Sequence, residues 1–253
     1  MKMKERWMDF CRQIKCYKEP KCPEAGLGLL DHWIESDDAD DPALKKYYKV
    51  YEVLKTYYSH QPRFYHTLEW HIANSLDELD SARHICEKSN QIEMALWFHD
   101  AVYDTVLDDS EEISAYLAEK VCNSMGLPKE FTAATKNLII STANHRDPKS
   151  NDDKIIVDID FSILGRPEKE FDRYETAVMK EYKLMAGLYS YTEKALLVGR
   201  IMFIHKMLGL PNIYHTDFFK EKYEDKARNN LKRSLERYRK EKEQRDSESQ
   251  FFR

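Results

Sequence analysis

Apolar residues recur at every third or fourth position through most of the chain, which places them on one face of an amphipathic helix. Between residues 42 and 59, for example, Leu44, Tyr47, Tyr51 and Leu54 follow this spacing. Pro and Gly interrupt the pattern at intervals and mark the predicted helix ends. These signals predict helices over residues 3–18, 29–36, 42–59, 67–87, 110–125, 128–143, 167–188, 192–208 and 217–245, with a further helix that starts near residue 90.

The segment 155–165 has a different pattern, because apolar and acidic residues alternate in it. A period of two is typical of a strand. The segment stands isolated among predicted helices, however. We therefore expect a buried helix entry there, with the carboxylates of Asp158 and Asp160 facing inward.

Composition supports the helical interpretation. Glycine is scarce, with 7 in 253 residues, roughly 3% against an average near 7%. Long stretches rich in Leu, Glu, Lys, Ala and Met favour helix over sheet. We expect an all-α protein, a bundle of about ten helices. No internal repeat or long linker is visible, so the sequence predicts a single domain over residues 1–253.

The charge balance narrows the classes of partner. Lys and Arg total 40 and Asp and Glu 45, which gives a net charge of −5 and argues against a general nucleic-acid binder. Residues 220–253 carry 12 basic and 8 acidic side chains, and we interpret the basic C-terminal helix at 217–245 as a solvated helix with ion pairs. No apolar run is long enough to span a membrane, and the N-terminus lacks the core of a signal peptide. We expect a soluble, cytoplasmic protein, and the sequence leaves its oligomeric state open.

The strongest chemical signal lies in the stretch from Ala95 to Asp104, where His99 and Asp100 follow an apolar run. Burying an ionised carboxylate costs several kcal/mol unless it is paired or bound to a metal. The adjacent imidazole makes a divalent cation the natural partner. The sequence therefore predicts a metal site at this position.

Two further side chains are candidates for completing the site. His66 precedes a predicted helix and Asp160 lies in the helix entry at 155–165, so helix ends can bring both to the His99-Asp100 pair. Imidazole nitrogens with carboxylate oxygens suit Mn, Co, Ni, Fe or Zn, and favour these ions over Mg. Four protein ligands leave room for water and substrate on an octahedral ion, and water bound to such an ion is acidified towards neutral pH.

The order His…His-Asp…Asp on a helical chain resembles the HD superfamily of metal-dependent phosphohydrolases. The resemblance is strongest to a subfamily of predicted phosphohydrolases and covers roughly residues 28–240, which would form an HD-like core beside the short N-terminal helix at 3–18. The similar motifs are R-F-Y-H-T-L at 63–68, W-F-H-D-A-V-Y-D at 97–104, S-E-E-I-S-A at 110–115, Thr142 with His145, and D-I-D-F-S-I-L-G at 158–165. One departure is visible: the subfamily places a second His four residues after the first, but here that position is Trp70 and His71 follows it. A one-residue insertion would restore the match.

The resemblance implies hydrolysis of a phosphate ester, on a small phosphorylated metabolite or a nucleotide. It implies His66, His99, Asp100 and Asp160 as metal ligands. Asp100, or Glu111 acting through water, would accept a proton, while Arg63 and His145 would offset charge on the phosphate. Each of the last three also has a structural interpretation: Glu111 as a first-turn helix residue, His145 as a polar helix end, and Arg63 as half of an ion pair.

Two other functions remain open on the sequence alone. An HD-type di-iron oxygenase typically needs two further histidines between the His-Asp pair and the last Asp, whereas this chain has only His145 there. A non-catalytic metal-stabilised helical scaffold or binding module is the other alternative, because membership of a subfamily does not establish turnover.

Overall fold

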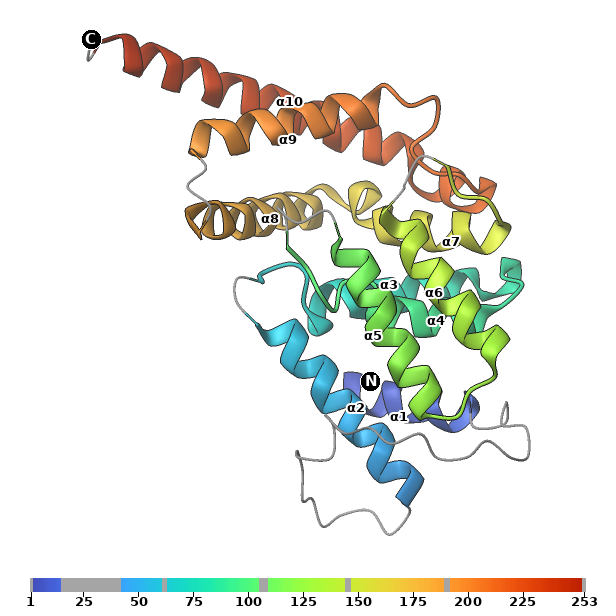
Figure 1. The fold of residues 1–253 in the computed structure, drawn as a ribbon. Coiled ribbons are helices and arrows are strands. Elements are labelled where there is room, and N and C mark those ends of the chain that lie inside the picture. Colours follow the sequence, from blue (N-terminus) through green and yellow to red (C-terminus); the bar gives the residue numbers. More distant parts are fainter. Residues whose placement is uncertain are drawn as a thin grey trace. The chain divides into compact units, whose positions relative to one another are not determined.

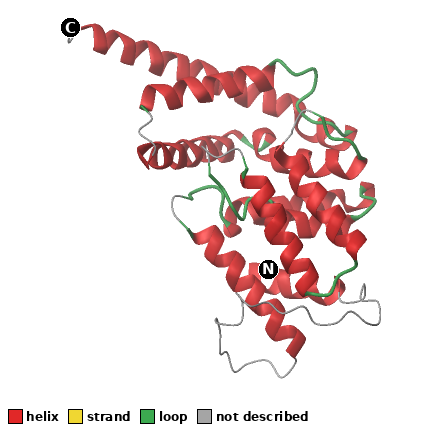
Figure 2. Cartoon of the chain, in the orientation of Figure 1, coloured by secondary structure: helices red, strands yellow, loops and turns green. Residues whose placement is uncertain are grey.

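The computed structural model describes residues 2–14, 42–60, 63–104, 109–143, 147–188 and 192–251. Within these ranges the chain forms helices joined by turns and loops, without a strand (Figures 1 and 2). The all-α prediction is confirmed for this part of the chain. None of the described helices is long and apolar enough to cross a membrane.

Ten α-helices and three shorter helical segments make up the described chain. The α-helices are α1 (Met3–Ile14), α2 (Pro42–Ser59), α3 (Ala73–Ala82), α4 (Ser89–Phe98), α5 (Ser110–Ser124), α6 (Lys129–Ala143), α7 (Asn151–Asp160), α8 (Glu168–Leu188), α9 (Glu193–Leu208) and α10 (Asp217–Phe251). The shorter segments are a π-helical turn η2 (Leu68–Ile72) and two 3-10 segments, η3 (Arg83–Ile85) and η4 (Phe161–Gly165). The predicted helix at 29–36 lies outside the described residues, and segment 155–165 forms the end of α7 and η4, so the preference for helix over strand is confirmed there.

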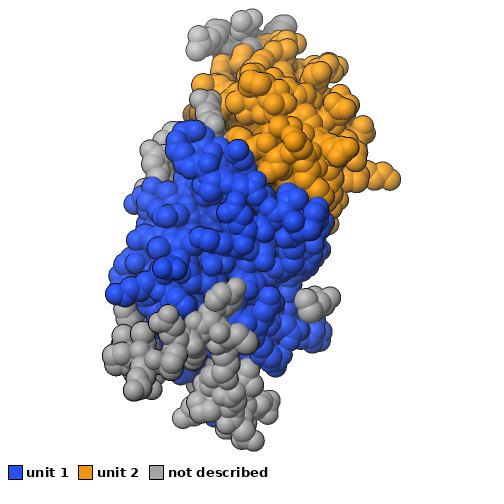
Figure 3. Space-filling model, turned by 90° about the vertical axis from the view of Figure 1, so that its right-hand side faces the viewer, with its two compact units in different colours: residues 1–156 blue, residues 157–253 orange. Residues whose placement is uncertain are grey.

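The chain divides into two compact units, coloured separately in Figure 3. Unit 1 is Met1–Ile156 and unit 2 is Val157–Arg253. The boundary falls inside the continuous helix α7. The single domain expected from the sequence stays a prediction.

Unit 1 is built around α4. The residues of this helix from Ile92 to Phe98 are all buried and all apolar except Glu93, as expected of a helix at the centre of a core. Helices α3, α5 and α6 pack against it. Helix α1 contributes Trp7, whose ring meets the ring of Trp97 edge-on, at 5.2 Å between centroids. The C-terminal end of α4 therefore lies in the core of unit 1, and His99 and Asp100 follow it directly.

The turn η2 introduces an extra residue into the helix that continues as α3. The amide of Ile72 donates to the carbonyl of Thr67, five residues earlier, at 3.2 Å. An i to i−5 bond defines a π-helical turn, and such single turns are frequent at functional sites. His71 lies within this turn and is buried.

Unit 2 consists of α8, α9 and α10 together with η4 and the last residues of α7. Helix α10 packs against η4 and α9, and α8 packs against α9. The contact of η4 with α10 requires Gly165, because a Cβ there would lie 2.5 Å from the Cβ of Tyr223. Inside the same unit, Arg200 of α9 pairs with the buried carboxylate of Glu175 of α8.

Candidate metal centre

His99 is oriented by the helix that it ends. Its Nδ1 lies 3.0 Å from the carbonyl oxygen of Leu96. Because a carbonyl can only accept, Nδ1 carries the hydrogen, and in a neutral ring Nε2 then offers a lone pair. The ring is buried. A backbone carbonyl on the far nitrogen is the usual way in which proteins orient a metal-binding imidazole.

His71 approaches this nitrogen from η2. Its Nε2 lies 2.9 Å from Nε2 of His99 and 3.0 Å from Oδ2 of Asp100. Its Nδ1 lies 3.0 Å from the hydroxyl of Tyr65. The second nitrogen of His71 is therefore also held by an outer partner, while Nε2 faces the other two groups.

These three atoms have the spacing of ligands around one ion. The third side of their triangle, from Nε2 of His99 to Oδ2 of Asp100, measures 3.4 Å. Ligand atoms placed about 2.0–2.2 Å from an ion stand about 3.0 Å apart in octahedral geometry and about 3.4 Å apart in tetrahedral geometry. Triangle sides of 2.9, 3.0 and 3.4 Å thus fit one face of such a shell.

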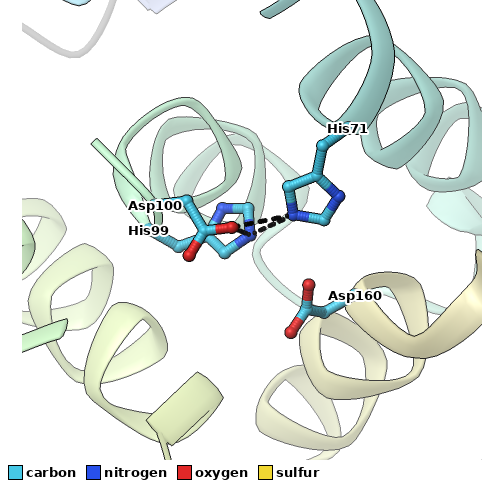
Figure 4. Close-up of side chains that lie close together, drawn as sticks. All are labelled: His71, His99, Asp100 and Asp160. Atoms are coloured by element: carbon cyan, nitrogen blue, oxygen red, sulfur yellow. Dashed lines mark hydrogen bonds and ion pairs between the residues drawn. The ribbon is translucent and has the colours of Figure 1, made fainter. Parts of the chain in front are cut away.

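Asp160 supplies a fourth candidate ligand from the end of α7. This helix starts in unit 1, where Asp152 accepts from the amides of Glu87 and Lys88 at 2.9 Å each. Asp160 lies about one helical turn beyond the boundary inside that helix. One ligand atom from each of His71, His99, Asp100 and Asp160 lies within 4.8 Å of the others, and the group can hold a metal ion (Figure 4).

The charge state of Asp100 suits this role. Burial by itself would raise the pKa of the carboxyl, but the imidazoles of His99, His71 and His66 outweigh burial and hold the pKa well below its usual range. The carboxylate is therefore ionised at neutral pH. Its side chain is 16% exposed, so the site is open to solvent at this residue.

His66, which the sequence predicts as a ligand, does not belong to this group. Its ring stacks on the ring of Tyr103, with 4.1 Å between centroids, and its centroid lies 5.3 Å from that of His71. His71 takes the expected place because the π-helical turn inserts one residue between the two histidines. The departure at Trp70 was the signal in the sequence, and the sequence alone could not say which histidine faced the site.

Arg63 forms hydrogen bonds with the backbone next to the candidate ligands. Its guanidinium donates to the carbonyls of Asp100 (2.7 Å), Ala101 (2.8 Å) and His66 (3.2 Å). The role expected from the sequence was an ionic contact to substrate phosphate. A guanidinium that is bonded to three carbonyls is instead placed to hold the chain, and sequence reasoning missed this role.

The other predicted residues fall in different surroundings. Glu111 is half-buried in the first turn of α5 and outside the four-residue group. His145 lies outside the described residues. Asp158 is fully buried and accepts from the amides of His215 and Thr216, at 2.7 and 2.8 Å, at the start of α10. Burial raises the pKa of Asp158 to about 6, although these bonds lower it, and Asp160 rather than Asp158 joins the candidate ligands.

Comparisons of the chain with models of protein families, with curated proteins and with solved structures found no match. The resemblance of its motifs to the HD superfamily therefore stays an expectation drawn from the sequence. What the structure contributes is a group of two buried imidazoles and two partly buried carboxylates with ligand-like spacing. Function has to be argued from that group.

Proposed function

We propose that the protein is a metal-dependent phosphohydrolase that acts on a small phosphorylated metabolite or a nucleotide. The observation that carries this proposal is the convergence of Nε2 of His71, Nε2 of His99 and Oδ2 of Asp100 to within 2.9–3.4 Å, with Asp160 in the same group. Metal binding takes carboxylates in the ionised form and imidazoles in the neutral form, so these four ligands would carry two negative charges, which one divalent ion neutralises. The mixed nitrogen and oxygen donors favour Mn, Co, Ni, Fe or Zn over Mg.

A divalent ion in such a site supplies a Lewis acid for a phosphoryl oxygen and acidifies water near neutral pH. The side chains of the chain do the rest. Asp100 stays ionised and partly exposed, so its carboxylate can take the proton of the attacking water. Glu111, in the first turn of α5, is the second candidate for that role. His66 lies beside the group, half-exposed and stacked on Tyr103, and is placed to contact a bound phosphate.

A phosphoester panel tests this function. Purified protein loaded with Mn²⁺, Co²⁺ or Ni²⁺ is assayed on nucleoside phosphates, sugar phosphates and aryl phosphates, beside Asp100→Asn and the control Asp109→Asn. Asp109 is exposed at the start of α5 and outside the group. We expect metal-dependent hydrolysis by wild type and the control, and at least about a 100-fold loss in Asp100→Asn, because even outer partners of metal ligands cost 10–100-fold.

The same assay separates the two alternatives. Wild type that binds metal but is inert across the panel would favour a metal-stabilised binding or scaffold protein. Two iron atoms per chain with oxygen uptake would favour the di-iron oxygenase. The di-iron class typically needs two further histidines between Asp100 and Asp160, where the sequence has only His145, which favours the hydrolase over a two-iron centre.

A further inference from the structure

The connector, which we define as residues 63–67 before η2, makes two contacts with the candidate metal centre. Arg63 reaches the end of α4 and Tyr65 reaches His71, and only one residue separates the two in the sequence. We propose that Arg63 and Tyr65 are positioning residues, which hold the two ligand-bearing segments of unit 1 in register for a divalent cation. The inference rests on the proposed metal site and assigns the two residues no contact with substrate.

Arg63 fixes the backbone that carries His99 and Asp100. The last carbonyls of a helix have no donor within the helix, and basic side chains often satisfy them. Here the guanidinium donates to the carbonyls of Asp100 and Ala101, directly beyond α4, and to that of His66 on the connector itself. The guanidinium, a fork of hydrogen-bond donors, thus links the end of α4 to the connector. Its planar set of donors can serve several acceptors at once, which a lysine ammonium on a flexible stem does not reproduce.

Aromatic rings keep the fork in place. The guanidinium carbon lies 5.1 Å from the centroid of the Tyr58 ring and 5.5 Å from that of Tyr103. Distances below about 6 Å are favourable for a cation over an aromatic face. The side chain is therefore held by both hydrogen bonds and ring contacts, as a positioning group needs to be.

Tyr65 fixes the ring of His71. Its side chain is buried, and its hydroxyl lies 3.0 Å from Nδ1 of His71. When Nε2 binds a cation, Nδ1 keeps the hydrogen and donates it to the phenol oxygen. The phenol oxygen can accept this hydrogen, so the bond fits the tautomer in which Nε2 is the ligand. It also sets the rotation of the ring that places Nε2 3.0 Å from Oδ2 of Asp100.

Together these contacts couple two segments that lie far apart along the chain. His71 belongs to η2 and Asp100 follows α4, so their relative position depends on what joins them locally. Arg63 holds one segment and Tyr65 the other, from a single short connector. Loss of either should misplace a ligand without removing it.

The test is titration of metal-free protein with Co²⁺, followed by its visible absorption spectrum and by calorimetry. The variants are Arg63→Lys and Tyr65→Phe. The first matched control is Arg228→Lys, which also loses a guanidinium bonded to three backbone carbonyls at a helix end. The second is Tyr58→Phe, which keeps the ring against Arg63 and loses only a hydroxyl bonded to a carbonyl of α4. We expect the two variants to bind Co²⁺ 10–100-fold more weakly, with a changed spectrum, because outer partners of metal ligands have effects of this size.

The controls should lose thermal stability but keep Co²⁺ affinity within about threefold and keep the wild-type spectrum, since they leave the ligands in place. Wild-type affinity and spectrum in Arg63→Lys and Tyr65→Phe would overturn the positioning role, and so would equal losses in the controls. If Arg63→Lys fails to fold, Tyr65→Phe decides, because it removes a single oxygen. Absence of Co²⁺ binding by wild type would overturn the metal site itself, a different result from the first.

Discussion

Two clusters of ionisable groups, the Glu175–Arg200 pair and the candidate metal ligands, show how differently a protein can treat charged side chains. In unit 2, the carboxylate of Glu175 pairs with Arg200 and accepts from the hydroxyl of Ser234 at 2.6 Å. The group of His71, His99, Asp100 and Asp160 contains imidazoles and carboxylates but neither lysine nor arginine. In the first cluster, the side chain of Arg200 is the cation. The second has the composition of a site that binds one from outside.

The pKa values express the same contrast. Burial would raise the pKa of Glu175, but Arg200 and Ser234 outweigh burial and lower it, as in a structural ion pair. The pKa of Asp100 is lowered mainly by neighbouring imidazoles, which are themselves metal ligands when neutral. Burial of charge therefore does not by itself mark a functional site. The chemical types that converge do.

The largest effect is expected from a substitution that removes the Glu175–Arg200 pair of unit 2. Glu175→Ala should lower the free energy of unfolding by about 3–5 kcal/mol, because it leaves the Arg200 charge buried without its carboxylate. Chemical denaturation measures the loss. Co²⁺ affinity of the folded variant should match wild type. A strong loss of metal affinity at unchanged stability would contradict the structural role of this pair.

Asp100→Asn should show the opposite behaviour in unit 1. We expect at least about a 100-fold loss of Co²⁺ affinity, or about 2.7 kcal/mol of binding free energy. Thermal stability without metal should change little, because the amide has nearly the same shape. A large loss of stability with intact metal binding would make Asp100 a structural residue.

Acid should weaken the cluster in unit 2 in a defined direction. The pKa of Glu175 in the folded protein lies below its ordinary value of 4.5, so the ionised form stabilises the fold above that pH. This contribution is lost as pH falls from 4.5 through the lowered pKa. The stability of wild type relative to Glu175→Gln should therefore decrease as pH falls from 6 to 3. A difference that stays constant or grows in acid would contradict the lowered pKa.

The smallest effect is expected from deleting Glu69, an exposed residue of η2. The deletion should convert the π-helical turn into a regular α-helical turn, since the bond from Ile72 to Thr67 then spans four residues. His71 keeps its place two residues before α3, so we expect Co²⁺ affinity within about threefold of wild type and a melting temperature no lower. Loss of metal binding on deletion would show that the π-helical turn itself shapes the site.

The sequence predicted much of this molecule, and its failures have identifiable causes. Helical periodicity located most of the described α-helices to within a few residues. Helix α7 was expected from its isolation among helices and not from its period, and the inward carboxylates of segment 155–165 foretold Asp160. The pair His99-Asp100 was evident because an apolar run buries it. The prediction of His66 as a ligand differs from the group in the structure, which contains His71. One inserted residue in a helix changes which side chain faces the site, and spacing rules assume a regular α-helix.

Arg63 could not be placed from the sequence for a different reason. A basic residue in a motif looks the same whether it binds phosphate or backbone carbonyls. The choice depends on which acceptors the end of α4 leaves without donors, and that is a property of the folded chain. The buried pair Glu175 and Arg200 was likewise invisible, because 25 residues separate its members.

The most direct test of the site compares two histidines that lie side by side in the structure. Calorimetric titration of Co²⁺ into metal-free wild type, His71→Gln and His66→Gln measures the affinity and the number of ions bound. We predict about one ion per chain for wild type, a loss of at least about 100-fold for His71→Gln, and a change of less than about tenfold for His66→Gln. A strong loss in His66→Gln with intact binding in His71→Gln would contradict the metal centre described here.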